Sequence, residues 1–182
     1  KNDDFKKVFK NIDIELLNSI VSGISSNSKN ISKGYIFIAI KGENFDGSNY
    51  IDDAQKNGAL LTLAEGIEDK NVFSLKKGAS RLMYSLLLGC FYEKQPKQII
   101  GVTGTNGKTS VVEFCRQIWA QAGWKAASMG TLGTKLETTT KIDTYQKSKS
   151  ALTTYEPSDL HKELENLFSK NVSHVAIEAS SH

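Results

Sequence analysis

The chain has 182 residues, and its 23 Lys and Arg against 20 Asp and Glu give a net charge of +3. The charges are mixed along the sequence, which excludes the strong positive field typical of nucleic-acid-binding and membrane-surface proteins. No apolar run approaches the roughly 20 residues that a membrane-spanning helix needs, and the charged start at Lys1–Lys10 does not resemble a secretory signal. We therefore predict a cytoplasmic globular protein.

Strand-like and helix-like segments alternate in the first half of the chain. A continuous apolar run at Tyr35–Ile40 predicts a strand that is covered on both faces. After a loop rich in Gly, Asn and Asp, Tyr50–Asn57 predicts a short helix. Ala59–Ala64 and Asn71–Leu75 predict two further strands. This alternation is typical of an α/β fold with a parallel sheet.

A longer helix is predicted at Ala79–Glu93. Apolar residues at helical spacing predict a core-facing stripe on it: Leu82, Met83, Leu86, Leu87, Cys90 and Phe91. Pro96 breaks the chain after this helix, so we predict two domains, 1–95 and 96–182. Cys90 and Cys115 both lie among apolar helical positions, which predicts buried, reduced thiols and no disulfide.

The second domain is predicted to start with a strand at Gln98–Val102 and a helix at Thr109–Ala122, which Gly123 would end. One face of this helix is predicted to be buried: Val111, Val112, Cys115, Ile118, Trp119 and Ala122. The following segment, KAASMGTLG, predicts a strand and then a turn.

The remaining residues predict a loop, a helix and a final strand. Glu137–Ser150 is polar and shows no period, so we expect a mobile loop there. Ser158 is predicted to cap a helix whose apolar residues are Leu160, Leu164, Leu167 and Phe168. The last strand is predicted at His174–Glu178.

The stretch GVTGTNGKTS has the order of a phosphate-binding loop: a strand, a glycine-rich turn and a helix. Gly104 and Gly107 allow a tight turn whose N–H groups point at one anion, next to the positive end of the helix dipole. Lys108 can supply a cation to the β- and γ-phosphates, and Thr109 can supply a hydroxyl to Mg²⁺. Val102 replaces the first glycine of the strict G-x-x-x-x-G-K-[ST] pattern, which disfavours a generic GTPase or kinase.

Glu178, at the end of an apolar strand, is the candidate carboxylate for the same cation. Carboxylates are rarely buried without a partner, and the sites of α/β proteins gather at the carboxyl ends of parallel strands. We therefore predict that Thr109 and Glu178 are the Mg²⁺ ligands, with Ser110 the poorer hydroxyl candidate.

Four motifs in register resemble the Mur ligase family: GVTGTNGKTS, MGTLG, LTTYEPSDLHKEL and HVAIEASSH. The segment SSNSKNISKGYIFIAIKGENFDGSNYIDDAQKNGA resembles the family's uridine-binding domain, so the resemblance runs from about Ser22 to His182. Within the family, the motifs are most similar to the MurE type. The resemblance implies a small uridine-binding α/β domain over 1–95, followed by the first part of a P-loop-type, parallel-sheet ATPase domain over 96–182.

This resemblance implies an ATP-dependent amide ligase of peptidoglycan precursor synthesis. ATP phosphorylates the carboxylate of UDP-MurNAc-L-Ala-D-Glu, and the amine of an amino acid then attacks the acyl phosphate and releases phosphate. The third residue added is meso-diaminopimelate or L-lysine, and we favour meso-diaminopimelate as the commoner case. The implied ligands are thus UDP-MurNAc-dipeptide, ATP, Mg²⁺ and an amino acid, bound by a monomer without nucleic-acid or membrane partners.

The resemblance also implies site residues, position by position. The ATP loop is Gly104, Thr105, Asn106, Gly107, Lys108, Thr109 and Ser110, and the catalytic residues are Lys108 and Glu178. The substrate-binding positions are Ser26, Ser28, Glu43, Asn44, Phe45, Leu152, Thr153, Thr154 and Ser180. Three residues depart from the family pattern: Asn27 and Lys29 in the D-S-R motif, and Tyr155, where a proline is common.

Several alternatives stay open from the sequence. The MurF type shares the front domain and the ATP loop, and a noncatalytic nucleotide-binding relative would share the fold. Folylpolyglutamate synthetases share the loop but lack a uridine domain. Members of the family continue for hundreds of residues, through a carbamylated lysine and an amino-acid-binding domain. We therefore expect the chain to be a fragment that does not complete the ligation alone.

Overall fold

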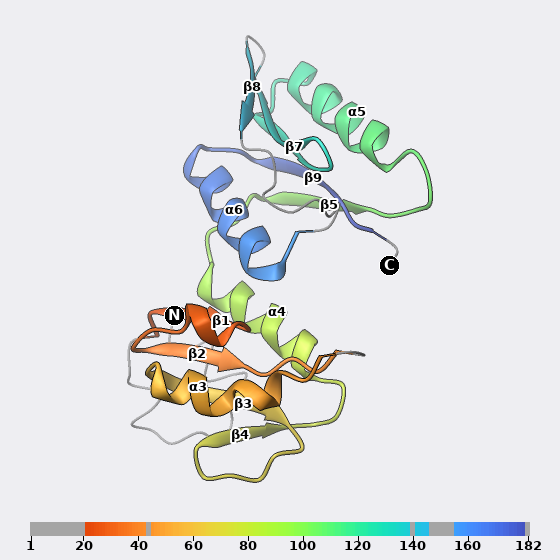
Figure 1. Cartoon of the computed structure of the whole chain (residues 1–182). Helices are drawn as coiled ribbons and strands as arrows, with labels where there is room; N and C mark the ends of the chain where they lie inside the picture. Colours follow the sequence, from red (N-terminus) through yellow and green to blue (C-terminus); the bar gives the residue numbers. More distant parts are fainter. Residues whose placement is uncertain (1–20, 43–44, 139–140, 146–154, 181–182) are drawn as a thin grey trace. The chain divides into compact units, whose positions relative to one another are not determined.

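The computed structural model describes residues 21–42, 45–138, 141–145 and 155–180, and it divides into two compact units between Glu93 and Lys94 (Figure 1). Each unit has its own sheet and its own core. Within the described residues, no helix combines the length and the apolar character that crossing a bilayer requires.

The first unit is built on a four-stranded parallel sheet with the strand order β1-β2-β3-β4. The strands are β1 Gly23–Ser25, β2 Tyr35–Ile38, β3 Ala59–Glu65 and β4 Val72–Leu75. The helices are the 3₁₀ turns η1 Ser28–Asn30 and η2 Gly47–Tyr50, together with α3 Ile51–Lys56 and α4 Ser80–Phe91. The strands predicted in this half are confirmed within two residues, whereas β1 was not predicted.

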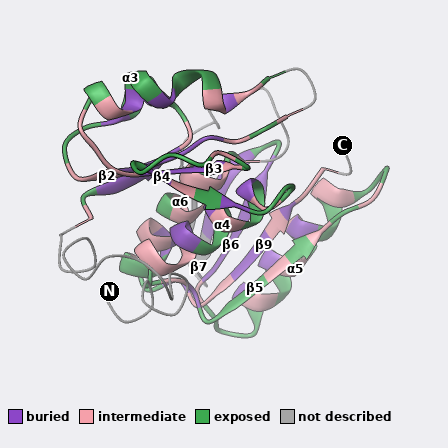
Figure 2. Cartoon of the chain, turned by 90° about the horizontal axis from the view of Figure 1, so that it is seen from below, coloured by how far each residue is buried: buried purple, intermediate pink, exposed green. Residues whose placement is uncertain are grey.

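The core of the first unit lies on both faces of this sheet (Figure 2). In β2, Ile36 and Ile38 pack with Leu87 of α4 on one face. Phe37 packs with Ala54 of α3 on the other face. Successive side chains of a strand point to opposite faces, so a strand with a helix over each face must be apolar at every position. The unbroken apolar run of this segment is thereby explained.

The predicted core stripe of α4 is wrong in part. Leu82 is 64% exposed and Leu86 is 47% exposed, whereas Tyr84, Leu87 and Leu88 are buried against the sheet. This helix is apolar on nearly all sides, so spacing alone did not determine which face would meet the sheet. Cys90 and Cys115 are each half-buried and not fully buried as predicted, and they are not joined by a disulfide.

The second unit has a five-stranded sheet with the order β5-β9-β6-β7-β8, in which β5 and β8 are the outer strands. The strands are β5 Gln98–Val102, β6 Ala126–Gly130, β7 Gly133–Thr138, β8 Lys141–Tyr145 and β9 His174–Glu178. β5, β9 and β6 run parallel, and β7 and β8 are added antiparallel to them. The carboxyl ends of β5, β9 and β6 therefore meet at one edge of the sheet.

Two helices cover opposite faces of this second sheet (Figure 1). α6, Pro157–Ser169, buries Leu164 and Leu167 against Val175 of β9. α5, Lys108–Gln121, lies on the other face against β6 and β9. The helices and strands predicted at these positions are confirmed, and Gly123 ends α5 with a φ of 87°.

The predicted buried face of α5 is also wrong in part. Val111 is 45% exposed and Ile118 is 63% exposed, whereas Val112, Arg116 and Ala120 are buried. A buried arginine faces the sheet because an acidic residue one turn earlier neutralises it, as described below. Charge pairing of this kind gives no apolar signal in a sequence pattern.

Two local predictions are corrected. Residues 137–138 and 141–145 are strand residues of the β7–β8 pair, not a loop, because threonine-rich segments pair well in sheets in spite of their polarity. The rest of the predicted loop, residues 139–140 and 146–150, lies outside the described residues. Glu156 caps α6 by accepting a hydrogen bond from the Ser158 N–H, so the predicted cap at Ser158 is wrong by two residues.

Candidate functional site

The glycine-rich loop forms the turn between β5 and α5. β5 ends at Val102, so this residue completes the strand and the loop proper starts at Thr103. Gly104 has a φ of 144° and Gly107 a φ of 79°, in the region that favours glycine. Gly107 has no side chain that could cap α5, so the first N–H groups of this 14-residue helix are left for a ligand or for water.

The loop lysine folds back over the turn. Lys108 is the first residue of α5, and its Nζ donates a hydrogen bond to the carbonyl oxygen of Gly104 at 2.7 Å. Thr109 is half-buried beside it, while Thr105, Asn106 and Ser110 are exposed. The loop thus carries an ammonium group, a hydroxyl group and a helix N-terminus within a few residues, which together favour an anion such as a phosphate.

Glu178 lies on the strand next to this loop. The parallel register of β5 and β9 pairs Val102 with Glu178, and the Ala179 N–H donates to the Val102 carbonyl at 2.9 Å. Neighbouring strands are about 4.8 Å apart. The sheet therefore places the carboxyl-bearing residue directly beside the residue that leads into the loop.

The Glu178 side chain is buried on the face of the sheet that α5 covers. Only 2% of the residue is exposed, and within the described residues Thr131 supplies its hydrogen bond, from Oγ1 to Oε2 at 3.0 Å. No described Lys, Arg or His forms an ion pair with it. A carboxylate buried beside one hydroxyl is costly unless a cation joins it, so the residue fits a metal ligand.

The residues present fit Mg²⁺ bound together with a nucleotide. Within the described part of the chain, no group of three His, Cys, Asp or Glu residues could hold a metal by itself. Mg²⁺ is usually bound through one or two carboxylates, substrate phosphates and water, and needs no complete protein cage. Glu178 and the Thr109 hydroxyl would provide the protein ligands in such an arrangement.

A charged network fixes α5 to the sheet behind the loop. The Glu113 carboxylate accepts hydrogen bonds from Ser128 of β6 at 2.6 Å, Arg116 at 2.8 Å and Lys135 of β7 at 3.0 Å. Burial alone would raise the pKa of Glu113, but these three donors outweigh it and hold the pKa below its ordinary value. The side chain is therefore ionised at neutral pH and joins three elements of the second unit.

Two of the predicted substrate segments lie at the same edge of the first sheet. Ser26 and Ser28 follow β1, and Phe45 lies in the loop that follows β2, the neighbouring parallel strand. Ser28 is buried, Ser26 is half-buried and Phe45 is 52% exposed. The Phe45 ring stacks on the exposed ring of Tyr50, with centroids 5.5 Å apart. The structure thus presents two exposed, stacked aromatic rings after β2.

Other predicted site residues are described only in part. Glu43, Asn44, Leu152, Thr153 and Thr154 lie outside the described residues. Ser180 follows β9 and is half-buried.

The chain was compared with known proteins. The sequence profile of the Mur ligase middle domain matches residues 102–182, and the profile described as the Mur ligase family, catalytic domain, matches residues 20–85. The chain belongs to the Mur ligase family. The two matched segments contain the phosphate loop with Glu178 and the turn after β1, respectively.

Two curated relatives of this Mur ligase chain share the name UDP-N-acetylmuramoyl-L-alanyl-D-glutamate–2,6-diaminopimelate ligase. The protein of Brucella melitensis is 41% identical over 165 residues, with 89% of this chain and 32% of the relative covered. That of Caulobacter vibrioides is 38% identical over 165 residues, with 90% and 34% covered. The chain thus spans about a third of the length of these relatives.

Solved structures agree with this family fold. A structure titled with the same ligase name has a TM-score of 0.73 at 23% identity, and covers 98% of this chain and 36% of its own length. A MurF structure from Acinetobacter baumannii has a TM-score of 0.58 at 18% identity, with 100% and 36% covered. At these identities the likeness supports the α/β fold alone.

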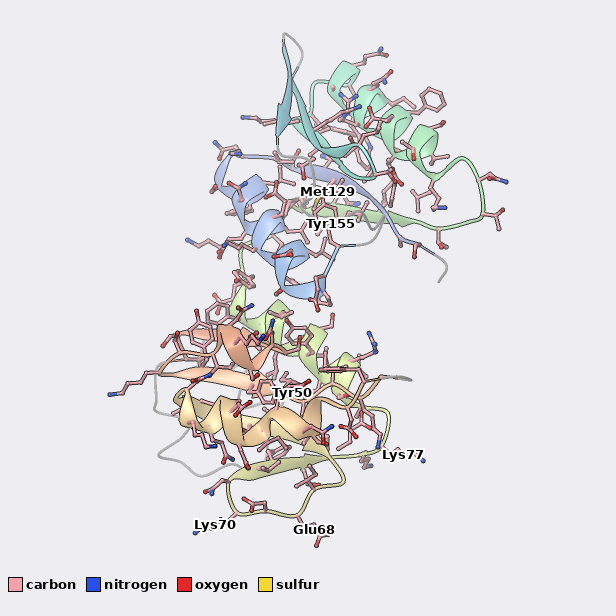
Figure 3. The ribbon with its side chains drawn as sticks, in the orientation of Figure 1. Tyr50, Glu68, Lys70, Lys77, Met129 and Tyr155 are labelled. Atoms are coloured by element: carbon pink, nitrogen blue, oxygen red, sulfur yellow. The ribbon has the colours of Figure 1, made fainter. Side chains whose placement is uncertain are left out.

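Two of the departures of this Mur ligase from the family pattern, Asn27 and Tyr155, have local structural roles. Asn27 caps η1, since its Oδ1 accepts the Lys29 N–H at 3.0 Å, as an aspartate would. Tyr155 packs on the α6 side of the second core with Met129 (Figure 3), and its hydroxyl bonds to Thr134 at 3.1 Å. Burial, together with the nearby charges of Glu163 and Glu178, raises the pKa of Tyr155.

The histidines and tryptophans pack against neighbouring side chains. The His174 ring stacks on Trp124 with centroids 4.3 Å apart, and Trp119 lies 5.2 Å from it. His161 Nδ1 lies 2.9 Å from Gln95 Nε2. Burial lowers the pKa of both His161 and His174, and the charge of Lys97 adds to the effect at His174.

The sequence did not predict three residues around the glycine-rich loop and Glu178: Gly130, Thr131 and Glu113. Gly130 and Thr131 lie in the quoted motif MGTLG, and small residues directly after a strand are a usable signal of close approach at a site. Glu113 offered no such signal, because its partners Ser128 and Lys135 are 15 and 22 residues away in sequence.

Proposed function

We propose that the chain forms the uridine-nucleotide-binding domain and the first part of the ATP-binding domain of a MurE-type ligase. Such an enzyme adds the third amino acid to UDP-MurNAc-L-Ala-D-Glu in peptidoglycan precursor synthesis. Of the two candidate amino acids, we favour meso-diaminopimelate over L-lysine. The names of the curated relatives support this substrate. The observation that carries the proposal is the register that pairs Val102 with Glu178, because it joins a phosphate loop to a buried carboxylate.

The proposed chemistry activates a carboxylate, which is a poor electrophile until one of its oxygens becomes a leaving group. The γ-phosphoryl group of ATP is transferred to the substrate carboxylate, with ADP released. The amino-acid amine then attacks the acyl phosphate carbon, forming the amide and expelling phosphate. Mg²⁺ would supply charge neutralisation between the two anions that must meet.

We assign the residues of this chain to two ligands. The ATP phosphates would be held by the loop Gly104, Thr105, Asn106, Gly107, Lys108, Thr109 and Ser110. Lys108 would exchange the Gly104 carbonyl for phosphate oxygens, and Thr109 and Glu178 would hold Mg²⁺. The uridine substrate would contact Ser26, Ser28, Glu43, Asn44, Phe45, Leu152, Thr153, Thr154 and Ser180. The cytoplasmic location and the monomeric state stay predictions.

Calorimetric binding to the 182-residue chain tests the proposal. We expect binding of UDP-MurNAc-L-Ala-D-Glu, weaker binding of UDP-MurNAc-tripeptide and none of folate. We also expect ATP to bind more tightly in the presence of Mg²⁺. Preference for the tripeptide would favour a MurF-type ligase, and preference for folate would favour a folylpolyglutamate synthetase. A chain that binds ATP but no uridine nucleotide would contradict the substrate assignment.

Turnover provides a second test of the assignment of this chain as one part of a ligase. With ATP, Mg²⁺, UDP-MurNAc-dipeptide and either amino acid, we expect residues 1–182 to release no phosphate above the background. Amino-acid-dependent phosphate release by this chain would show that all catalytic groups lie within it, and would contradict the assignment.

A further inference from the structure

The Glu178 carboxylate lies against the turn between β6 and β7. β6 pairs with β9 in parallel, with Met129 opposite Ile177, so the next residue of each strand, Gly130 and Glu178, are neighbours at the carboxyl edge. Val175 and Met129 pack toward α6. Gly130 and Glu178 therefore face the opposite side, where α5 and its loop lie.

Gly130 leaves the space that this carboxylate fills. A Cβ atom built on Gly130 would overlap the Cγ, Cδ and Oε1 atoms of Glu178. The backbone of Gly130 does not have a positive φ, so the reason for glycine here is space and not backbone conformation. The Glu178 carboxylate consequently packs directly against the Gly130 backbone at the end of β6.

Thr131 holds one oxygen of the same carboxylate. Its Oγ1 donates to Oε2 at 3.0 Å, and within the described residues Oε1 receives no hydrogen bond. Thr131 as a residue is exposed, so a change of its side chain disturbs no packed core. One carboxylate oxygen is thus fixed by a hydroxyl, while the other keeps its lone pairs for a cation.

We propose that Thr131 is a positioning residue for the metal carboxylate: it fixes Oε2 of Glu178 so that Oε1 is presented to the divalent cation of the bound nucleotide. This inference rests on the proposed function, and goes beyond it by assigning a role to a residue of the β6–β7 turn. Hydrogen-bond partners of metal ligands orient the ligand, and their loss typically weakens metal binding by about 10- to 100-fold.

The test compares Thr131→Val, which removes the hydroxyl at nearly constant shape, with Thr131→Ser, which keeps it. Mg²⁺ is titrated into the 182-residue chain with ATP, and ATP binding is followed by calorimetry. We expect Thr131→Val to raise the Mg²⁺ midpoint by about 10-fold, and Thr131→Ser to keep it within about 3-fold of the unmodified chain. ATP affinity without Mg²⁺ should not change in either variant.

Thr134→Val is the matched control. Thr134 lies three residues after Thr131, in β7. Its hydroxyl forms a hydrogen bond with the Tyr155 hydroxyl and not with Glu178. We expect this variant to change the melting temperature without changing the Mg²⁺ midpoint. Thr131→Ala provides a second deletion of the hydroxyl, and should reproduce the effect of Thr131→Val.

Three outcomes would overturn the inference. An unchanged Mg²⁺ midpoint in Thr131→Val and Thr131→Ala would leave Thr131 a purely structural residue. An equal shift in Thr134→Val would show a general loosening of the turn. If the unmodified chain binds ATP without any effect of Mg²⁺, the metal site of the proposed function fails, and this inference fails with it.

Discussion

Lys108 and Gly104 contact each other across the phosphate loop, with the lysine ammonium 2.7 Å from the glycine carbonyl oxygen. The lysine is therefore already directed over the turn, at the N-terminal end of α5 where an anion would bind. In the proposed ATP complex, only the hydrogen-bond acceptor of Lys108 has to change.

The first prediction concerns the charge of this lysine. Lys108→Met keeps most of the side-chain length but removes the ammonium group. Hydrogen bonds to charged groups contribute about 1.5–3 kcal/mol, so we expect the affinity of the 182-residue chain for ATP with Mg²⁺ to fall by about 10- to 100-fold. Calorimetry measures this affinity. Lys162→Met, an exposed substitution on α6, is the control, and an unchanged affinity in Lys108→Met would show that the loop does not bind phosphate.

A second prediction uses two glycines of the same sheet. Gly130→Ala places a methyl group where the Glu178 carboxylate lies, whereas Gly101→Ala on β5 meets no atom within 4 Å. We expect Gly130→Ala to lower the free energy of unfolding by about 1–3 kcal/mol, and to weaken Mg²⁺-dependent ATP binding. Gly101→Ala should stay within about 0.5 kcal/mol of the unmodified chain. Denaturant unfolding and calorimetry of both variants check this, and equal behaviour of the two would contradict the packing of Gly130 on Glu178.

The network around Glu113 carries the third prediction. Glu113→Gln removes the carboxylate charge that lies 2.8 Å from the guanidinium of Arg116, a residue that is 2% exposed. Removing one partner of a buried charge pair lowers the free energy of unfolding by about 3–5 kcal/mol. Because water has partial access to Lys135, we expect a smaller decrease of about 2 kcal/mol, measured by denaturant unfolding. Glu163→Gln on α6, whose carboxylate accepts the Asn166 amide, should lose less than about 1 kcal/mol. Similar losses in both variants would refute a special role for Glu113.

The fourth prediction concerns pH and the first unit. The Glu65 carboxylate, at the end of β3, accepts the N–H groups of Gly78 at 2.7 Å and of Ser80 at 2.9 Å, and thereby caps α4. Hydrogen bonds from the Ser80 side chain and from these N–H groups lower the pKa of Glu65 below its ordinary value of 4.5. A lowered pKa stabilises the fold above the unfolded-state pKa, and this contribution is lost as the pH falls through the folded-state pKa.

Melting temperatures measured between about pH 3 and pH 6 test this capping role. We expect the melting temperature to drop on acidification in the unmodified chain, and to depend less on pH in Glu65→Gln. The control is Glu68→Gln, since Glu68 projects from the first unit into solvent (Figure 3). A pH dependence that survives unchanged in Glu65→Gln would refute the role of Glu65.

The sequence predicted those elements whose structure depends on the residues of one short segment. The apolar run of β2 and the strand–glycine–lysine order around Gly104 predicted a parallel strand and a tight turn between a strand and a helix, because burial on both faces and tight turns leave clear sequence traces. The buried face of α4 was not determined, since this helix is apolar on almost all sides.

Contacts between residues far apart in sequence could not be predicted. The capping of α4 by Glu65 joins residues 13 and 15 positions apart, and the bond from Thr131 to Glu178 spans 47 positions. Both depend on which strands become neighbours, and no local periodicity encodes that order. The position of Glu178 beside the loop was predicted only because carboxyl ends of parallel strands share an edge.

The strand that leads into the phosphate loop is also an outer strand of its sheet. Among the described strands β5 pairs with β9 alone, so the backbone groups on its other side are open to a further strand. A polypeptide added there would restrain the same backbone as the nucleotide that we propose for the loop. Coupling between two binding events is reciprocal. If the nucleotide raises the affinity for the added strand by some factor, the added strand raises the affinity for the nucleotide by the same factor.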